Sequence, residues 1–473
     1  MPRTAMSVPF LLQETLRVVP RRYRLPALPA ASDDLSKTQP ATALAIVIEQ
    51  ARRAMARGEG LTASMKHAFV DSLARLIEEA MRDVSGDPVF KATLLRHRAA
   101  EVREYVALSE HAKEDRRSIR ASVNAIAHPG KHRTSSERQR EAFARLHAAA
   151  SSPYCHGLAD IAHDLLSAPD IANDSPLRQW LTRLVESPSL LRLQRLESLR
   201  EDERVRQYVA LWDKNGPRSG SAQAAAQGNA SQKRGTAAEA RAARALRVMA
   251  DRLNQEEGAD RPYRVVTSMR APATIPGSAE RAKSEWDAVL LRQAIGSDET
   301  PLWDVCLLVE SKASVDAATT DLSRLLRGIA LLAHAEENVA YAFDTSQGAV
   351  HLRGSSLREL STDEGSLQKS VVYCCDAPFE AAQRVLGAGS RMQLLSAQPS
   401  LEFAIMLEDG QAADTQTLEP VWDQLLHLPR WRSVLDQYQT LRRVRELMVH
   451  TEDLRTAIDE VSARRTLPGG PTR

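Results

Sequence analysis

The sequence predicts an α/β core, of element order αβββαβ with a mixed sheet, flanked by a large all-α N-terminal region and a helical C-terminal region. Three observations predict this fold class. Apolar residues recur at helical spacing through residues 41–213, with almost no β-branched alternation. After residue 234 the pattern changes to helix, three strands, helix, strand. From about residue 377 helical spacing returns.

Composition sets the expected domain boundaries. The 473 residues are too many for one ordinary domain. KNGPRSGSAQAAAQGNASQKR, from residue 214, is rich in Gly, Ser, Ala, Gln and Asn and has no periodicity, which is typical of a flexible linker. The expected parts are an N-terminal arm (1–40), an all-helical domain (41–213), a flexible linker (214–233), an α/β domain (234–380) and a helical C-terminal region (381–473).

The N-terminal helices are predicted from apolar spacing and from their stop signals. TALAIVIEQARRAMARG ends on Gly58, and LTASMKHAFVDSLARLIEEAMRDVSG ends on Gly86. HPGKHRTSSERQ carries turn residues and an N-cap before EAFARLHAAA. Two further helices are expected in FKATLLRHRAAEVREYVALSEHA and LLRLQRLESLREDERVRQYVALW.

The α/β part begins with a helix, GTAAEARAARALRVMADRLNQ. RPYRVVTSM, SEWDAVLLRQ and LWDVCLLVESKA are predicted strands, and AIGSDETP joins the last two by a connection of hairpin length. ATTDLSRLLRGIALLAHA is predicted to be an amphipathic helix capped near Thr319 or Thr320. The remaining predicted elements are the strands NVAYAFD and VVYCCD and the helices EPVWDQLLHL and WRSVLDQYQTLRRVRELMVH.

Cysteine usage, hydropathy and net charge exclude several classes of protein. The four cysteines form no C-x-x-C pair, so neither a zinc ribbon nor a redox motif is indicated. Low cysteine content fits a reducing cytoplasm, and the sequence contains no 18-residue apolar run that predicts a membrane span. The net charge of +2 gives no strong electrostatic footprint for nucleic acid over the whole chain.

The stretch LLVESKAS, residues 307–314, is the strongest pointer to chemistry. Strand alternation places Glu310 and Lys312 on one side and Ser311 on the other. If the preceding strand pairs antiparallel, Asp287 at its start lies beside them. Two close carboxylates repel each other unless a cation lies between them. A hard divalent ion such as Mg²⁺ prefers oxygen ligands of this kind.

Asp287 followed by Glu310-Ser311-Lys312 resembles the pattern of the PD-(D/E)XK nuclease superfamily, with Trp286 in place of the usual proline. The upstream RGTAAEARAARAL resembles the opening helix of archaeal-type Holliday junction resolvases. The resemblance covers residues 234–345, about a quarter of the chain. It implies a restriction endonuclease-like core.

The resemblance also implies roles for particular residues. Glu239, Asp287 and Glu310 are expected to hold Mg²⁺ or Mn²⁺, and Ser311 to lend a backbone carbonyl to the metal. Lys312 is expected to position the water that attacks a phosphodiester, with stabilisation of the phosphate charge. The four catalytic candidates are therefore Glu239, Asp287, Glu310 and Lys312.

Structural interpretations of the same residues remain open. Glu239 as a helix-surface carboxylate and Glu310 with Lys312 as a plain cross-strand ion pair are the simplest. Asp287 could instead pair with Arg264, and Glu285 could replace or assist Asp287. Asp321 and Arg324 could approach the phosphate or belong to a solvated helix face. His128 and His132 are expected in a turn, and Cys155-His156 lacks further metal ligands.

Three functions follow from these alternatives. The leading hypothesis is a metal-dependent nuclease, acting on DNA rather than RNA. The second is a nucleic-acid-binding module that keeps the nuclease fold without the chemistry; residues 234–345 carry 14 Lys/Arg against 17 Asp/Glu, so this segment is not basic. The third is a protein that binds a protein partner through its helical regions.

Overall fold

The structure is a computed structural model. It describes residues 9–25, 28, 35–128, 137–152, 157–168, 175–216, 221–258, 261–295, 300–378 and 384–466. Cys155, His156 and His132, which were considered above as metal ligands or turn residues, lie outside these ranges.

The chain folds as two compact units. The first comprises Met1–Leu76, Ala222–Leu394 and Thr415–Arg473, and the second comprises Ile77–Ser221 and Leu395–Asp414. This division differs from the boundaries expected from composition, because N-terminal and C-terminal segments join the α/β part. The expected N-terminal arm contains the helix α1 (Phe10–Val18), whose Leu11 and Leu12 are fully buried.

A mixed sheet of seven strands, within the described residues, forms the centre of the first unit. The predicted strands are present as β1 (Tyr263–Arg270), β2 (Glu285–Gln293), β3 (Leu302–Lys312), β4 (Ala340–Phe343) and β6 (Val371–Cys375). Two short strands were not predicted: β5 (Val350–Arg353) and β7 (Met448–His450), the latter within a segment expected to be helical.

The strand order is β1-β2-β3-β5-β4, with β6 beside β3 and β7 beside β6. The pairs β1–β2, β2–β3 and β4–β5 are antiparallel, and β3–β5, β3–β6 and β6–β7 are parallel. The first half of β3 pairs with β5 and its second half with β6. The end of β3 therefore lies between β2 and β6, inside the sheet.

The helix α12 (Ala222–Glu257) corrects the expectation of an unstructured linker over 214–233, because residues 222–233 belong to it. Its second half buries a stripe that includes Ala242, Leu246 and Met249. Once this anchored half has nucleated the helix, extension costs little. Ala and Gln, which dominate the first half, have good helix propensity, so the helix continues although that half is largely exposed.

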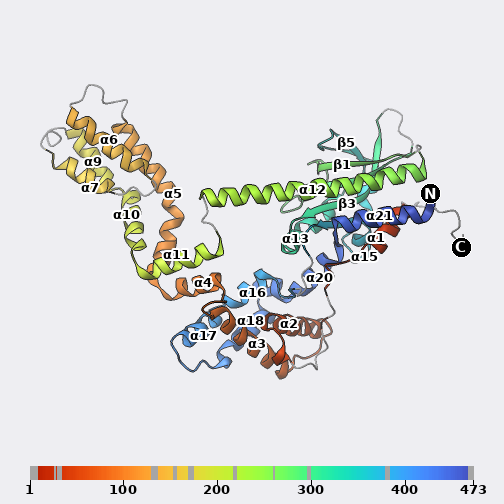
Figure 1. Ribbon diagram of the computed structural model, residues 1–473, viewed down its shortest axis with the longest axis horizontal. Coiled ribbons are helices and arrows are strands. Elements are labelled where there is room, and N and C mark those ends of the chain that lie inside the picture. Colours follow the sequence, from red (N-terminus) through yellow and green to blue (C-terminus); the bar gives the residue numbers. More distant parts are fainter. Residues whose placement is uncertain are drawn as a thin grey trace. The chain divides into compact units, whose positions relative to one another are not determined.

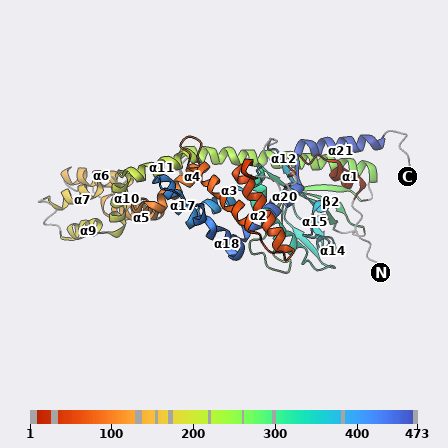
Figure 2. The ribbon, with the colours of Figure 1, turned by 90° about the horizontal axis from the view of Figure 1, so that it is seen from below.

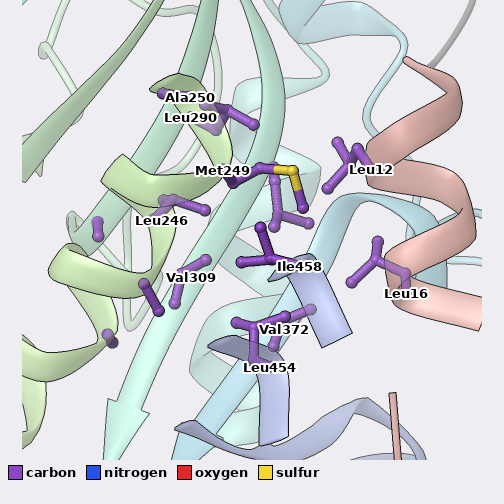
Figure 3. Packing of buried hydrophobic residues seen from close by; sticks show 14 of the residues in the cluster. Leu12, Leu16, Leu246, Met249, Ala250, Leu290, Val309, Val372, Leu454 and Ile458 are labelled. Carbon is purple, nitrogen blue, oxygen red and sulfur yellow. The ribbon is translucent and has the colours of Figure 1, made fainter. Parts of the chain in front are cut away.

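One face of the sheet is covered by α1, α12 and α21 (Thr451–Thr466), which Figure 2 shows along one side of the strands. Figure 3 shows Leu12 and Leu16 of α1, Met249 of α12 and Ile458 of α21 converging on the strand residues Leu290, Val309 and Val372. Helices from both ends of the chain thus complete one hydrophobic core.

The opposite face carries α13 (Val315–Leu332). The helix begins earlier than predicted, because Ser314 caps it by accepting a hydrogen bond from the Ala317 backbone N–H at 3.2 Å. Its buried stripe includes Ala318, Leu322 and Leu325. The α13 helix follows Lys312 after only two residues, so it is bound closely to the end of β3.

The other helices of the first unit are α2 (Pro40–Ala56), α3 (Ala63–Met81, which extends into the second unit), α14 (Gly354–Arg358), α15 (Glu364–Ser370), α16 (Ala388–Leu395), α18 (Glu419–His427), α19 (Arg432–Leu435) and α20 (Gln437–Leu447), with short 3₁₀ helices at Leu35–Lys37, Thr415–Leu418 and Pro429–Trp431.

The second unit is helical (Figure 1). Its helices are α4 (Pro88–Arg98), α5 (Ala100–Ala127), α6 (Glu137–Ser151), α7 (Leu158–Leu166), α9 (Ser175–Val185), α10 (Pro188–Arg200), α11 (Glu203–Asn215) and α17 (Gln398–Glu408). A leucine-rich core joins α5, α6, α7, α9 and α10. Across the parts of both units that the structure describes, every helix is too short or too polar to cross a bilayer.

Candidate functional site

The register of β2 and β3 brings the predicted acidic residues together. Ala288 lies opposite Val309, so the next pair along the two strands is Asp287 and Glu310. The Asp287 Oδ2 accepts a hydrogen bond from the Ser311 backbone N–H at 2.7 Å. Ala288 and Val309 belong to the core under α12. Alternation therefore turns Asp287 and Glu310 to the face that carries α13.

Glu310 is the central residue of the site. Its side chain is fully buried. Its Oε2 lies 2.8 Å from the Lys283 Nζ and 3.2 Å from the Lys312 Nζ. Its Oε1 is buried without a hydrogen-bond partner in the part of the chain that the structure describes. One carboxylate oxygen thus receives two ammonium groups, while the other is left unsatisfied at a cost in free energy.

The site is electrostatically strained. Burial, followed by the nearby carboxylate of Asp287, raises the pKa of Glu310 to about 8, although Lys283 and Lys312 oppose this rise. Burial acts to lower the pKa of Lys312, but Glu310, Asp321 and Asp287 outweigh it and raise that pKa. The lysine therefore remains an ammonium group at neutral pH.

Asp321 of α13 also belongs to the site, which corrects the expectation of a solvated face. It is 9% exposed, and its Oδ2 lies 3.4 Å from the Lys312 Nζ and 3.9 Å from the Lys283 Nζ. The hydroxyl of Tyr373, a buried residue of β6, donates to the same oxygen at 3.3 Å. Tyr373 is in register with Glu310 on the neighbouring strand. Arg324, by contrast, is exposed as expected.

Lys283 reaches the site because its loop packs tightly on α13. Its backbone N–H donates to the Arg324 carbonyl oxygen at 3.0 Å. Gly328 permits this approach, since a Cβ at that position would lie 2.8 Å from the Lys283 carbonyl oxygen. The small residue within the buried stripe of α13 thus makes room for the loop that carries a second lysine.

Glu239 is linked to the site by charge. It lies on the exposed side of α12, and its pKa is raised by partial burial and then by the Asp287 carboxylate, while Lys312 lowers it. Ser311 contributes its backbone N–H to Asp287. The metal role expected for the Ser311 carbonyl stays a prediction.

Several alternative interpretations can now be judged from contacts. Arg264 is in register with Leu291, and its guanidinium lies over the ring of Trp303, 5.9 Å from the centroid, rather than serving as the partner of Asp287. Glu285 pairs with Arg270 at 3.1 Å. His128 lies edge-on against His147.

Lys283 and Tyr373 were missed by sequence reasoning, and Asp321 was assigned to a solvated face, although Lys283 and Asp321 left a signal. Lys283 stands two residues before Glu285 and four residues before Asp287, so extended alternation would place it on the same side as both. Asp321 interrupts the apolar stripe of its helix between Ala318 and Leu325, which indicates a buried carboxylate. Tyr373 lies in an apolar strand without any such signal.

No group of three or more His, Cys, Asp or Glu side chains is arranged to hold a metal ion within the described ranges. The acidic side chains thus form a charged cluster rather than a preformed cage. Comparison of the chain with protein-family models, curated proteins and solved structures gives no match.

Proposed function

We propose that the protein is a metal-dependent nuclease that hydrolyses phosphodiester bonds in nucleic acid, with DNA as the expected substrate. The observation that carries the proposal is the environment of Glu310, a buried carboxylate with two lysines on one oxygen and no partner on the other. A purely structural ion pair is expected to satisfy both carboxylate oxygens with protein donors, whereas a ligand for a cation keeps one oxygen for the cation.

The charge of the cluster supports the same conclusion. Glu239, Asp287, Glu310 and Asp321 face two ammonium groups, so the cluster carries an excess of two negative charges when all four carboxylates are ionised, as they would be once a cation displaces the proton of Glu310. A divalent cation would balance this excess and relieve the repulsion between Asp287 and Glu310. Carboxylate oxygens are the donor type that Mg²⁺ and Mn²⁺ prefer, so Glu239, Asp287 and Glu310 are the residues that would close around the ion, since the described residues form no preformed cage.

When bound, such an ion supplies Lewis-acid activation of the phosphate and of the attacking water. The chain's own residues supply the rest. The Ser311 backbone N–H holds the Asp287 side chain through one carboxylate oxygen, Oδ2. Lys312 presents an ammonium group that orients the water and stabilises charge on the phosphate. The restriction endonuclease-like arrangement of these strands remains part of the proposal.

The test is cleavage of supercoiled plasmid, linear duplex, branched and single-stranded DNA, and of RNA, by the purified full chain with Mg²⁺ or Mn²⁺. Cleavage by the wild type and its loss in Asp287→Ala and Glu310→Ala would support the proposal. Lys312→Ala should retain Mn²⁺ binding, measured by calorimetry, and lose about 100- to 10,000-fold in rate. Failure to cleave any of these substrates would refute the proposal.

The same assays separate the rival functions. Salt-dependent binding of DNA without cleavage, unchanged in Asp287→Ala, would indicate a binding module. Capture of a protein partner without any binding of nucleic acid would indicate an interaction protein.

A further inference from the structure

We infer that Asp321 is a positioning residue that holds the Lys312 ammonium group in place while Glu310 serves a cation. The inference rests on the proposed function and names a further residue of the same site. It draws on the contacts among Lys312, Asp321, Glu310 and Tyr373.

Lys312 has two carboxylate partners. Its Nζ lies 3.2 Å from the Glu310 Oε2 and 3.4 Å from the Asp321 Oδ2, so it bridges the two carboxylates. Glu310 shares that same oxygen with Lys283, which lies closer, at 2.8 Å. The Asp321 Oδ2 lies farther from the Lys283 Nζ, at 3.9 Å, than from the Lys312 Nζ, so Asp321 is the second anchor of Lys312.

A cation bound to Glu310 would change the electrostatic environment of Lys312. A positive ion beside Glu310 repels an ammonium group only a few ångströms away, and in a buried site this repulsion is poorly screened. A second carboxylate in contact with the lysine offsets the repulsion. Asp321 is that carboxylate, because its Oδ2 lies 3.4 Å from the Lys312 Nζ, and without it Lys312 would lose its orientation.

Asp321 is itself held in place by the surrounding structure. It is 9% exposed and lies in the buried stripe of α13, between Ala318 and Leu322. Its Oδ2 accepts a hydrogen bond from the Tyr373 hydroxyl at 3.3 Å, and Tyr373 is fully buried in β6. The anchor is thus tied to both the covering helix and the sheet, so it can fix the lysine between them.

The experiment compares Asp321→Asn with Asp316→Asn, an exposed carboxylate in the first turn of the same helix. With supercoiled plasmid and Mg²⁺, Asp321→Asn should lower kcat about 100-fold, the loss typical of a misplaced catalytic group, with KM little changed. Asp316→Asn should behave as the wild type. Tyr373→Phe, which removes only the bond to the anchor, should show a smaller loss of kcat.

A double-mutant cycle tests whether Asp321 acts through Lys312. If it does, Asp321→Asn should have no further effect on kcat in a Lys312→Met background. A loss that multiplies with that of Lys312→Met, or an equal loss in Asp316→Asn, would overturn the inference. Circular dichroism and thermal unfolding of every variant identify any that fails to fold.

A second readout needs neither metal nor activity. Acylation of the metal-free protein by acetic anhydride, followed by mass spectrometry, reports how firmly each lysine is held. Asp321→Asn should increase modification of Lys312 several-fold relative to exposed Lys233, whereas Asp316→Asn should not. Unchanged modification of Lys312 would overturn the inference. If the wild type cleaves no substrate, the proposed function fails while this measurement still decides whether Asp321 holds Lys312.

Discussion

Glu310 makes the stability of the metal-free protein depend on pH in an unusual direction. Its pKa rises from an ordinary 4.5 in the unfolded chain to about 8 in the folded protein. A carboxyl group whose pKa is raised on folding binds its proton more tightly in the folded state than in the unfolded state. The stabilisation that this proton on Glu310 gives to the folded state is therefore fully present below pH 4.5 and is lost as the pH rises through 8.

The magnitude follows from the size of this rise. Each pKa unit corresponds to about 1.4 kcal/mol. The rise from 4.5 to about 8 therefore lowers the free energy of unfolding at high pH by about 5 kcal/mol relative to its value below pH 4.5. Glu310→Gln keeps the side chain neutral at every pH. The variant should match the wild type near pH 4.5 and exceed its free energy of unfolding by several kcal/mol at pH 8.

The assay is urea unfolding in EDTA at several pH values between 4.5 and 8.5, followed by tryptophan fluorescence. Trp286, adjacent to Asp287 on β2, is fully buried and reports on the first unit. Glu285→Gln, which leaves Glu310 in place, is the matched control and should retain the pH dependence of the wild type. A difference between Glu310→Gln and the wild type that stays constant with pH would refute the reasoning.

Two further predictions concern packing around the sheet. Asp304 is fully buried and accepts hydrogen bonds from Arg353 at 2.7 and 2.6 Å. Arg353→Ala should destabilise the protein by about 3 kcal/mol in urea unfolding, because it removes both hydrogen bonds and leaves the buried charge with only the more distant Arg261, at 3.6 Å. Adding Asp304→Asn should restore part of the loss. Gly328→Ala should lower the free energy of unfolding by about 1–3 kcal/mol, because its Cβ would lie 2.8 Å from the Lys283 carbonyl oxygen. Gly389→Ala, at a position open to solvent, is the control and should leave the free energy of unfolding unchanged. Equal effects of the two substitutions would contradict the packing argument.

Local sequence patterns determined the order of the elements in the α/β part and the side of the sheet on which several site residues lie. The alternation in residues 307–314 placed Glu310 and Lys312 on one side of a strand, and the hairpin-length connection placed Asp287 beside them. Helical spacing and strand runs also predicted the order of elements from α12 to β4. These features follow from the sequence because the periods of helix and strand are local properties of the backbone.

Tertiary structure decided which charges share the site and which segments share a core. Asp321 is buried only because α13 packs back on the face of β3 that carries Lys312, and Lys283 joins them only because Gly328 lets its loop approach. The helix α1, from the N-terminus, completes a core with α21 from the other end of the chain. Such contacts join residues far apart in sequence, and no periodicity records them, because burial depends on the partner that covers a residue as well as on the residue itself.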